Sequence, residues 1–241
     1  IGVSAGATTG ISYAARQRGR ARYSNIDLMK QYDYVGLKTF IKQRNIMDFN
    51  LLFNVFPKKI YPFDYQTYFN SPERFIMVTS NCLTGEAVYL EEKQDEKRVL
   101  DICVATCSLP LLCPIAYVDG IPMVDGGVCD ALPIRKSEAD GNSRNVIVLT
   151  RNKGYRKPVK QQKLPGFVFR KYPELRRELM LRYQRYNETI EYIEQLEADG
   201  KALVIRPIRD VVVDRIERDV DKLTSFYEEG YACAKAAFEK K

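Results

Sequence analysis

The chain opens with IGVSAGATTG (Ile1–Gly10), and residues 2–6 of this stretch spell the motif Gly-x-Ser-x-Gly. The apolar run Ile1–Val3 is typical of the end of a buried strand, and the small residues that follow predict a helix that packs closely against it. A nucleophilic serine has to stand clear of a sheet at a strand-to-helix turn of this kind. The pattern therefore predicts that Ser4 is a nucleophile, and the alternative is a glycine-flanked turn without chemistry.

Two further features of this motif bear on chemistry. A turn this tight is expected to demand glycine on either side, at Gly2 and Gly6, for its conformation and for room. The helix after Ser4 directs its first N–H groups and its positive end at the turn, so the backbone amide of Ala5 could help to hold an oxyanion.

The absence of histidine restricts how a serine could be activated. A serine hydroxyl is a poor nucleophile until a base accepts its proton, and no Ser-His-Asp triad can be assembled from these residues. The remaining candidates for the base are carboxylates and lysines. Asp125 stands out because it ends the apolar segment IPMV (121–124) and precedes Gly126 and Gly127, which permit a sharp turn that presents the carboxylate. The alternative is an ordinary Asp-Gly turn.

Composition and charge limit the partners of the chain. Its 241 residues fit one α/β domain, and no apolar run approaches the roughly 20 residues that a membrane span needs. The net charge of +7 suits an anionic partner such as a phospholipid surface or nucleic acid, or it is a solvated basic exterior. No nucleic-acid-binding motif accompanies this charge, so we expect no nucleic-acid partner.

The six cysteines form no C-x-x-C pair. Without histidine, the common zinc ligand sets are also incomplete. We therefore expect buried free thiols in a reducing compartment, which favours a cytoplasmic location, and we expect no metal and no organic cofactor.

The hydrophobic patterns predict strands that alternate with helices, which indicates an α/β fold with a mainly parallel sheet. The run NVIVLT (145–150) is of the kind found in a strand buried on both faces. The expected strands are 75–81 and 86–90, joined as a hairpin through Thr84-Gly85, then 145–150 and 202–207. The expected helices after the first are 34–43, 97–107, 173–198 and 219–241.

Three segments resemble the patatin-like phospholipase family, in particular its bacterial members. They are GVSAG (2–6), CSLPLLCPI (107–115) and VDGGVCDALPIRKS (124–137). The resemblance extends to NVIVLTRNKGYRK (145–157), RYNETIEYIEQLE (185–197) and VIRP (204–207), so it covers nearly all of the chain.

This resemblance implies a three-layer α/β/α fold and a Ser-Asp dyad, in which Ser4 is the nucleophile and Asp125 the general base. Gly126 and Gly127 become the turn that presents the base. Three residues of the proline-containing block ahead of the aspartate are implied to shape the wall of a cleft: Ser108, Pro110 and Pro114.

One departure from the family concerns the oxyanion hole. The family places a glycine-rich segment of D-G-G-G-x-R-G type upstream of the nucleophile strand, and its backbone amides form the oxyanion hole. We expect this segment and its strand to lie ahead of Ile1. We further expect a single patatin-like domain over 1–241, with a core of about 1–155 and a C-terminal extension of helices and strand over about 165–241.

The function that the resemblance implies is lipid acyl hydrolysis, of the phospholipase A or esterase type, through an acyl-enzyme. The expected partners are a lipid or ester substrate and, transiently, an anionic membrane surface, with the protein cytoplasmic or peripheral to a membrane. The alternative is a non-catalytic, lipid- or membrane-surface-binding member of the same fold. The aromatic run Phe53–Phe69 is either a wall or lid for acyl chains, an interfacial contact, or core packing.

Overall fold

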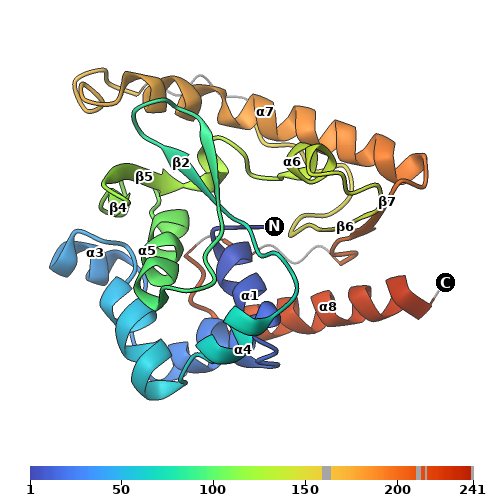
Figure 1. Cartoon of the computed structure of the whole chain (residues 1–241), viewed down its shortest axis with the longest axis horizontal. Coiled ribbons are helices and arrows are strands. Elements are labelled where there is room, and N and C mark those ends of the chain that lie inside the picture. The colour runs from blue at the N-terminus through green and yellow to red at the C-terminus, as the bar shows by residue number, and fades with distance from the viewer. Residues whose placement is uncertain (159–163, 210–212, 215, 240–241) are drawn as a thin grey trace. The chain divides into compact units, whose positions relative to one another are not determined.

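The computed structural model describes residues 1–158, 164–209, 213–214 and 216–239 (Figure 1). The strands are β1 (Gly2–Val3), β2 (Met77–Asn81), β3 (Ala87–Leu90), β4 (Ala116–Val118), β5 (Ile121–Asp125), β6 (Asn145–Val148) and β7 (Ala202–Ile205). The α-helices are α1 (Ala5–Ala14), α2 (Arg20–Arg22), α3 (Leu37–Gln43), α4 (Tyr65–Asn70), α5 (Glu96–Cys107), α6 (Ile134–Ala139), α7 (Pro173–Ala198) and α8 (Val220–Glu239). The 3₁₀ and π-helical turns are η1 (Tyr23–Asp27), η2 (Leu28–Lys30), η3 (Leu51–Ile60) and η4 (Gly126–Val128).

The chain divides into two compact units. The first unit contains residues 1–131 and 161–182, and the second contains residues 132–160 and 183–241. Helix α7 contributes its first turns to the first unit and the remainder to the second. The expected division into a core and a C-terminal extension remains a prediction.

The sheet of the first unit has the strand order β1-β2-β5-β4, and β3 also pairs with β2. Strands β1 and β2 are parallel, whereas β2 pairs antiparallel with both β3 and β5, and β4 pairs antiparallel with β5. The expectation of a mainly parallel sheet is therefore wrong for this unit. Short turns explain the β2–β3 and β4–β5 pairs, because the expected hairpin at Thr84-Gly85 and a second one at Asp119-Gly120 force antiparallel pairing, whereas the β2–β5 pair joins strands distant in sequence.

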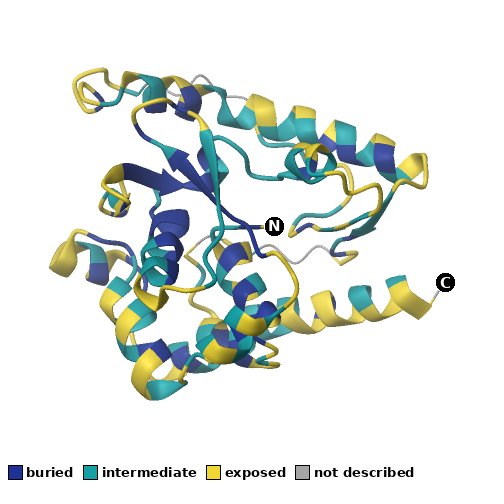
Figure 2. Ribbon diagram, in the orientation of Figure 1, coloured by how far each residue is buried: buried dark blue, intermediate teal, exposed yellow. Residues whose placement is uncertain are grey.

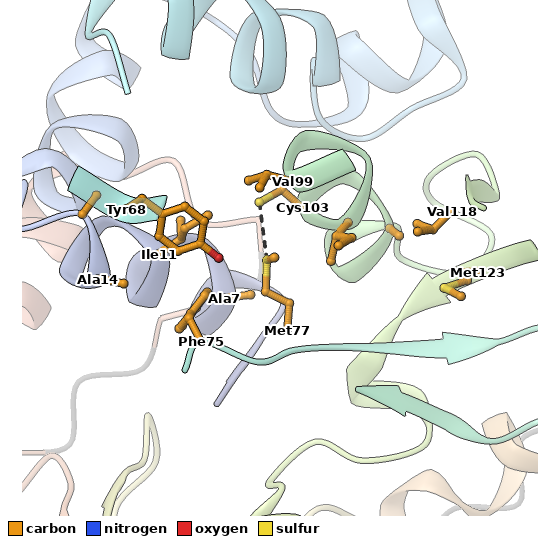
Figure 3. Close-up of a cluster of buried hydrophobic side chains, with 13 residues drawn as sticks. Ala7, Ile11, Ala14, Tyr68, Phe75, Met77, Val99, Cys103, Val118 and Met123 are labelled. Carbon is orange, nitrogen blue, oxygen red and sulfur yellow. Dashed lines mark hydrogen bonds between the residues drawn. The ribbon is translucent and has the colours of Figure 1, made fainter. Parts of the chain in front are cut away.

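Helices α1 and α5 cover one face of this sheet (Figure 1). Their apolar side chains form a core with Met77 of β2 and Met123 of β5, and both methionines are almost completely buried. Figure 3 shows this core, in which the Cys103 thiol of α5 lies 3.8 Å from the sulfur of Met77. The buried residues form a continuous band along β2, β5 and α5 (Figure 2).

The opposite face of the same sheet packs against the first turns of α7. Leu175 and Leu179 of that helix join Cys82 and Val124 in a second buried cluster. Helices thus cover both faces of β2 and β5, and the predicted three-layer α/β/α arrangement is confirmed. The predicted α5 and α7 and the β2–β3 hairpin are also confirmed.

The second unit contains the parallel pair β6–β7. Ile147 of β6 packs against Ile190 and Ile193 of α7 in a separate core. Val146 and Val148, in contrast, are 56% and 69% exposed. The strand predicted from NVIVLT is present, but the expected burial on both faces is wrong, because only the face that carries Ile147 packs against α7. A β-branched run indicates a strand without showing how many of its faces are covered.

The aromatic run 53–69 forms part of the core of the first unit. Phe56 of η3 and Tyr68 of α4 are buried, and Phe53, Phe63 and Phe69 pack partly buried beside them. Among the alternatives for this run, the structure supports core packing.

Candidate active site

Ser4 occupies the turn between β1 and α1, where the sequence predicts it. Its backbone dihedrals are φ 53° and ψ −124°, a combination that residues with a side chain rarely adopt. Such a conformation costs of order 1–3 kcal/mol and persists only where surrounding contacts enforce it. The Ser4 side chain is half-buried, and the next two residues, Ala5 and Gly6, are exposed. The turn is therefore strained and accessible.

The two glycines of the motif differ in what they do. A Cβ atom on Gly2 would lie 2.6 Å from Cα of Ala7, so only glycine lets α1 pack this closely on β1. A Cβ atom on Gly6 would have no described atom within 4 Å. Glycine is therefore sterically required at Gly2, whereas Gly6 lies in the first turn of α1 on its exposed side, and the role of both in the motif stays a prediction.

Hydrogen bonds fix both backbone groups of Ser4. Its amide donates to Oγ1 of Thr106 at 2.9 Å, and its carbonyl accepts from the amides of Ala7 at 2.9 Å and Thr8 at 3.2 Å. The predicted oxyanion donor, the amide of Ala5, is the first of α1, where helix amides have no intrahelical acceptor and the helix dipole is positive.

Asp125 ends β5 and is buried, with 5% of its surface exposed. Its Oδ1 accepts a hydrogen bond from the Gly127 amide at 2.7 Å, and its carbonyl oxygen accepts from the Ser80 hydroxyl at 2.9 Å. A Cβ atom on Gly126 would lie 2.3 Å from the carbonyl oxygen of Val78, so glycine is required there. The Asp-Gly-Gly segment is thus a sharp turn pressed against the backbone of β2.

The sheet register brings the two turns to one edge of β2. Strand β3 pairs along the other edge, whereas Val3 of β1 pairs with Val78 and Asp125 of β5 pairs with the next residue, Thr79, along this one. Ser4 follows Val3 directly, so the serine turn and Asp125 lie next to each other along the same edge of β2. A Cβ atom on Gly127 would accordingly lie 4.0 Å from Cγ1 of Val3.

The side chain of Cys107, the last residue of α5, interacts with both candidate residues. Burial, with the negative charge of Asp125 second, raises the pKa of the Cys107 thiol well above its ordinary value, and a hydrogen bond with the Ser4 side chain opposes this rise. The thiol therefore stays neutral at neutral pH. Sequence patterns indicated only that Cys107 is a buried thiol, which is confirmed, and did not indicate its place between the two residues.

The proline-containing block begins at Ser108, directly after Cys107. Ser108 is buried, and its carbonyl accepts the Asp125 amide at 2.9 Å. Pro110 is half-buried and Pro114 is exposed, and whether they form the wall of a cleft stays a prediction. In the part of the chain that the structure describes, no group of three or more His, Cys, Asp or Glu side chains is arranged to hold a metal ion.

The two turns lie within a segment that is similar to a known family. The profile of the patatin-like phospholipase family matches residues 1–136, more than half of the chain. The chain belongs to the patatin-like phospholipase family. Both Ser4 and Asp125 of this patatin-like chain fall inside the match.

A second profile, a domain of unknown function (DUF6363), matches residues 172–240 of this patatin-like chain. These residues include α7, β7 and α8. No curated protein matches the chain significantly.

Membership of the family supports lipid acyl hydrolysis and a lipid substrate at the level of the family. A search of the described residues found no helix with the length and apolar character needed to cross a membrane.

Proposed function

We propose that this protein is a serine lipid acyl hydrolase in which Ser4 is the nucleophile and Asp125 the general base. The observation that carries the proposal is that two sharp turns meet along the same edge of β2, one with a strained serine and the other with a buried aspartate. The 241 residues contain no histidine, and Asp125 is the carboxylate next to the serine turn, which supports its role as the base. Membership of the patatin-like phospholipase family adds independent support.

The reaction then follows from these groups. Asp125 accepts the proton of the Ser4 hydroxyl as Oγ attacks the ester carbonyl carbon, and a tetrahedral oxyanion forms. The backbone amide of Ala5 and the positive end of α1 help to stabilise that oxyanion. The C–O bond to the alcohol breaks, the proton passes to the departing oxygen, and the acyl group stays on Ser4. Water, deprotonated by Asp125, attacks this acyl-enzyme, releases the fatty acid and restores the Ser4 hydroxyl.

The decisive experiment measures ester hydrolysis and covalent labelling by a fluorophosphonate in the full-length protein. Ser4→Ala and Asp125→Asn should each lower turnover by about 10⁴-fold. Labelling should map to Ser4 in the unaltered protein and disappear in Ser4→Ala. A matched control is Asp119→Asn, which changes an exposed carboxylate on the β4–β5 turn, paired with Arg98, and should leave hydrolysis unchanged.

The outcomes separate the candidate functions. Activity at the level of the unaltered protein in Ser4→Ala or Asp125→Asn would refute the assigned dyad. A folded full-length protein that binds lipid vesicles but neither hydrolyses esters nor reacts with the fluorophosphonate would instead be a non-catalytic lipid-binding member of the family.

We infer further that the enzyme contacts an anionic membrane surface through α3. Leu37 and Ile41 are 69% and 74% exposed and lie four residues apart, on one face of the helix. Exposed Lys38 and Lys42 lie beside them, so the helix offers apolar and cationic groups together. This combination suits the boundary between lipid headgroups and acyl chains, and the net charge of +7 acts in the same direction.

Sedimentation with vesicles of phosphatidylserine and phosphatidylcholine tests this contact. The double variant Leu37→Gln/Ile41→Gln should bind at least several-fold more weakly than the unaltered protein, and its binding should remain sensitive to salt. Leu83→Gln serves as the control, because Leu83 is 56% exposed on the β2–β3 turn, away from α3. Equal loss in both proteins would argue against α3 as the contact.

Since the six described cysteines are free thiols, we further propose that the protein works in the cytoplasm.

A further inference from the structure

The hydroxyl group of Thr106 connects two strands to the end of α5. Thr106 is completely buried, its Oγ1 accepts the Ser4 amide at 2.9 Å, and it donates to the carbonyl of Val78 at 2.6 Å. Val78 is the residue of β2 that pairs with Val3, immediately before Ser4. One hydroxyl therefore bridges the nucleophile turn and the strand along whose edge both Ser4 and Asp125 lie.

The Thr106 hydroxyl does not hydrogen-bond within its own helix. A serine or threonine hydroxyl in or at the end of a helix commonly donates to the carbonyl one turn earlier, as Ser108 does by donating to Val104 at 2.8 Å. Thr106 instead directs its hydroxyl out of α5 to the backbone of β2. The helix itself gains no hydrogen bond from this choice, so its effect falls on the turn at Ser4.

The Ser4 amide needs such a partner because it lies at the junction of β1 and α1. It donates to Thr106, and it cannot bond within α1, which begins at Ala5. A partly buried amide without an acceptor is unfavourable, and the strained conformation would then lose a contact that holds it. The Thr106 hydroxyl satisfies the amide and so favours the conformation that presents the Ser4 side chain.

The two residues after Thr106 extend the same arrangement to the aspartate. The Ser4 side chain and the charge of Asp125 both act on the pKa of the buried Cys107 thiol, so this side chain lies close to both. The Ser108 carbonyl accepts the Asp125 amide at 2.9 Å. Three consecutive residues at the end of α5 thus lie against both of the turns beside β2.

We propose that Thr106 is a positioning residue that holds the Ser4 turn in its strained conformation, and that the run Thr106–Ser108 sets the nucleophile against Asp125. This proposal rests on the proposed function of Ser4 and Asp125 and identifies what aligns them. Thr106 does not touch the ester. It acts through the backbone amide of Ser4, so its loss should lower reactivity of Ser4 more than binding of substrate.

The test compares Thr106→Val, Thr106→Ala and Thr106→Ser in the full-length protein. Valine keeps the shape without the hydroxyl, alanine removes the hydroxyl without adding bulk, and serine keeps the hydroxyl. Thr106→Val and Thr106→Ala should lower the rate of fluorophosphonate labelling and kcat by about 10- to 100-fold with KM nearly unchanged, because a shift of about 1 Å in a reacting group has this effect. Thr106→Ser should restore most of the lost rate.

A control variant and a correction for the folded fraction distinguish the possible outcomes. Thr39→Val changes another buried threonine, on α3, and should leave labelling unchanged. Rates are expressed per folded molecule, from thermal unfolding of each variant. If the unaltered protein does not label at Ser4, the proposed function itself fails. If it labels and Thr106→Val or Thr106→Ala labels equally fast, or Thr106→Ser loses as much as Thr106→Ala, then the positioning role of Thr106 is wrong while the dyad stands.

Discussion

The turns that follow β1 and β5 lie along the same edge of β2, yet they bend in different ways. At Ser4 the positive φ is carried by a residue with a side chain, and hydrogen bonds from neighbouring elements hold it there. At Asp125 the bend relies on Gly126, which fits against the Val78 carbonyl where no other residue could. The nucleophile turn therefore stores strain, whereas the base turn avoids it by giving up a side chain.

This difference has a chemical reason. The nucleophile must be exposed enough to meet an ester, so its own residue has to occupy the tip of the turn. The base must stay buried beside it, so the tip of its turn can be glycine, and the Gly127 amide can hold the carboxylate.

The strongest test of the base turn is Gly126→Ala. The added Cβ would lie 2.3 Å from the Val78 carbonyl oxygen, and backbone cannot move away as easily as a side chain. The free energy of unfolding should fall by about 3 kcal/mol, as in a severely overpacked core, measured by urea denaturation.

Gly127→Ala is the matched control for that variant. Its Cβ would lie 3.0 Å from Oδ1 of Asp125, which is the end of a side chain that can shift. We expect a smaller loss of stability than for Gly126→Ala, together with a loss of ester turnover. Equal stability losses in the two variants would contradict the view that Gly126 alone is pressed against β2.

On the nucleophile side, Gly2→Ala should lower the free energy of unfolding by about 2 kcal/mol, because the Cβ would lie 2.6 Å from Cα of Ala7. Gly6→Ala should change it by less than about 1 kcal/mol, because that Cβ would have no described neighbour within 4 Å. Urea denaturation of the pair measures both effects, and similar losses would show that α1 does not pack on β1 as described.

The strain at Ser4 can be measured by comparing Ser4→Gly with Ser4→Ala. Both variants lose the nucleophile, but only glycine relaxes at φ 53° without steric cost. Ser4→Gly should be more stable than Ser4→Ala by about 1 kcal/mol, after allowance for the greater freedom of unfolded glycine. If alanine is the more stable of the two, the turn at Ser4 is not strained and the contrast with the Asp125 turn disappears.

The smallest effect concerns the neutral thiol between the two turns. Burial raises the pKa of Cys107 above its ordinary value of 9.0, so the contribution of the neutral thiol is complete below pH 9 and declines as the unfolded state ionises above it. Between about pH 8 and pH 10, Cys107→Ala should lose less stability than the unaltered protein, by about 1 kcal/mol. Other buried thiols and tyrosines titrate in both proteins and cancel in the difference, so identical pH slopes would mean that Cys107 is not shielded as described.

Much of this architecture could be predicted from local patterns. The limits of α5 and α7 and the β2–β3 hairpin follow from hydrophobic periodicity, capping residues and turn residues that are close in sequence. The sharp turn after β5 could be predicted from Gly126 and Gly127, which follow an apolar run. The mixed direction of the sheet and the exposed side of β6 could not, because strand pairing and coverage depend on segments distant in sequence.

The sequence by itself determined that a serine turn follows the first strand and that these 241 residues offer no histidine as its base, since both follow from residue identity. Only the tertiary structure decided that Asp125 lies next to Ser4 along the same edge of β2, and that Thr106 satisfies the Ser4 amide. The physical reason is that sheet register and a hydroxyl bonded to the backbone of another strand leave no periodic pattern in the chain. They arise only when β1, β2, β5 and α5 pack together.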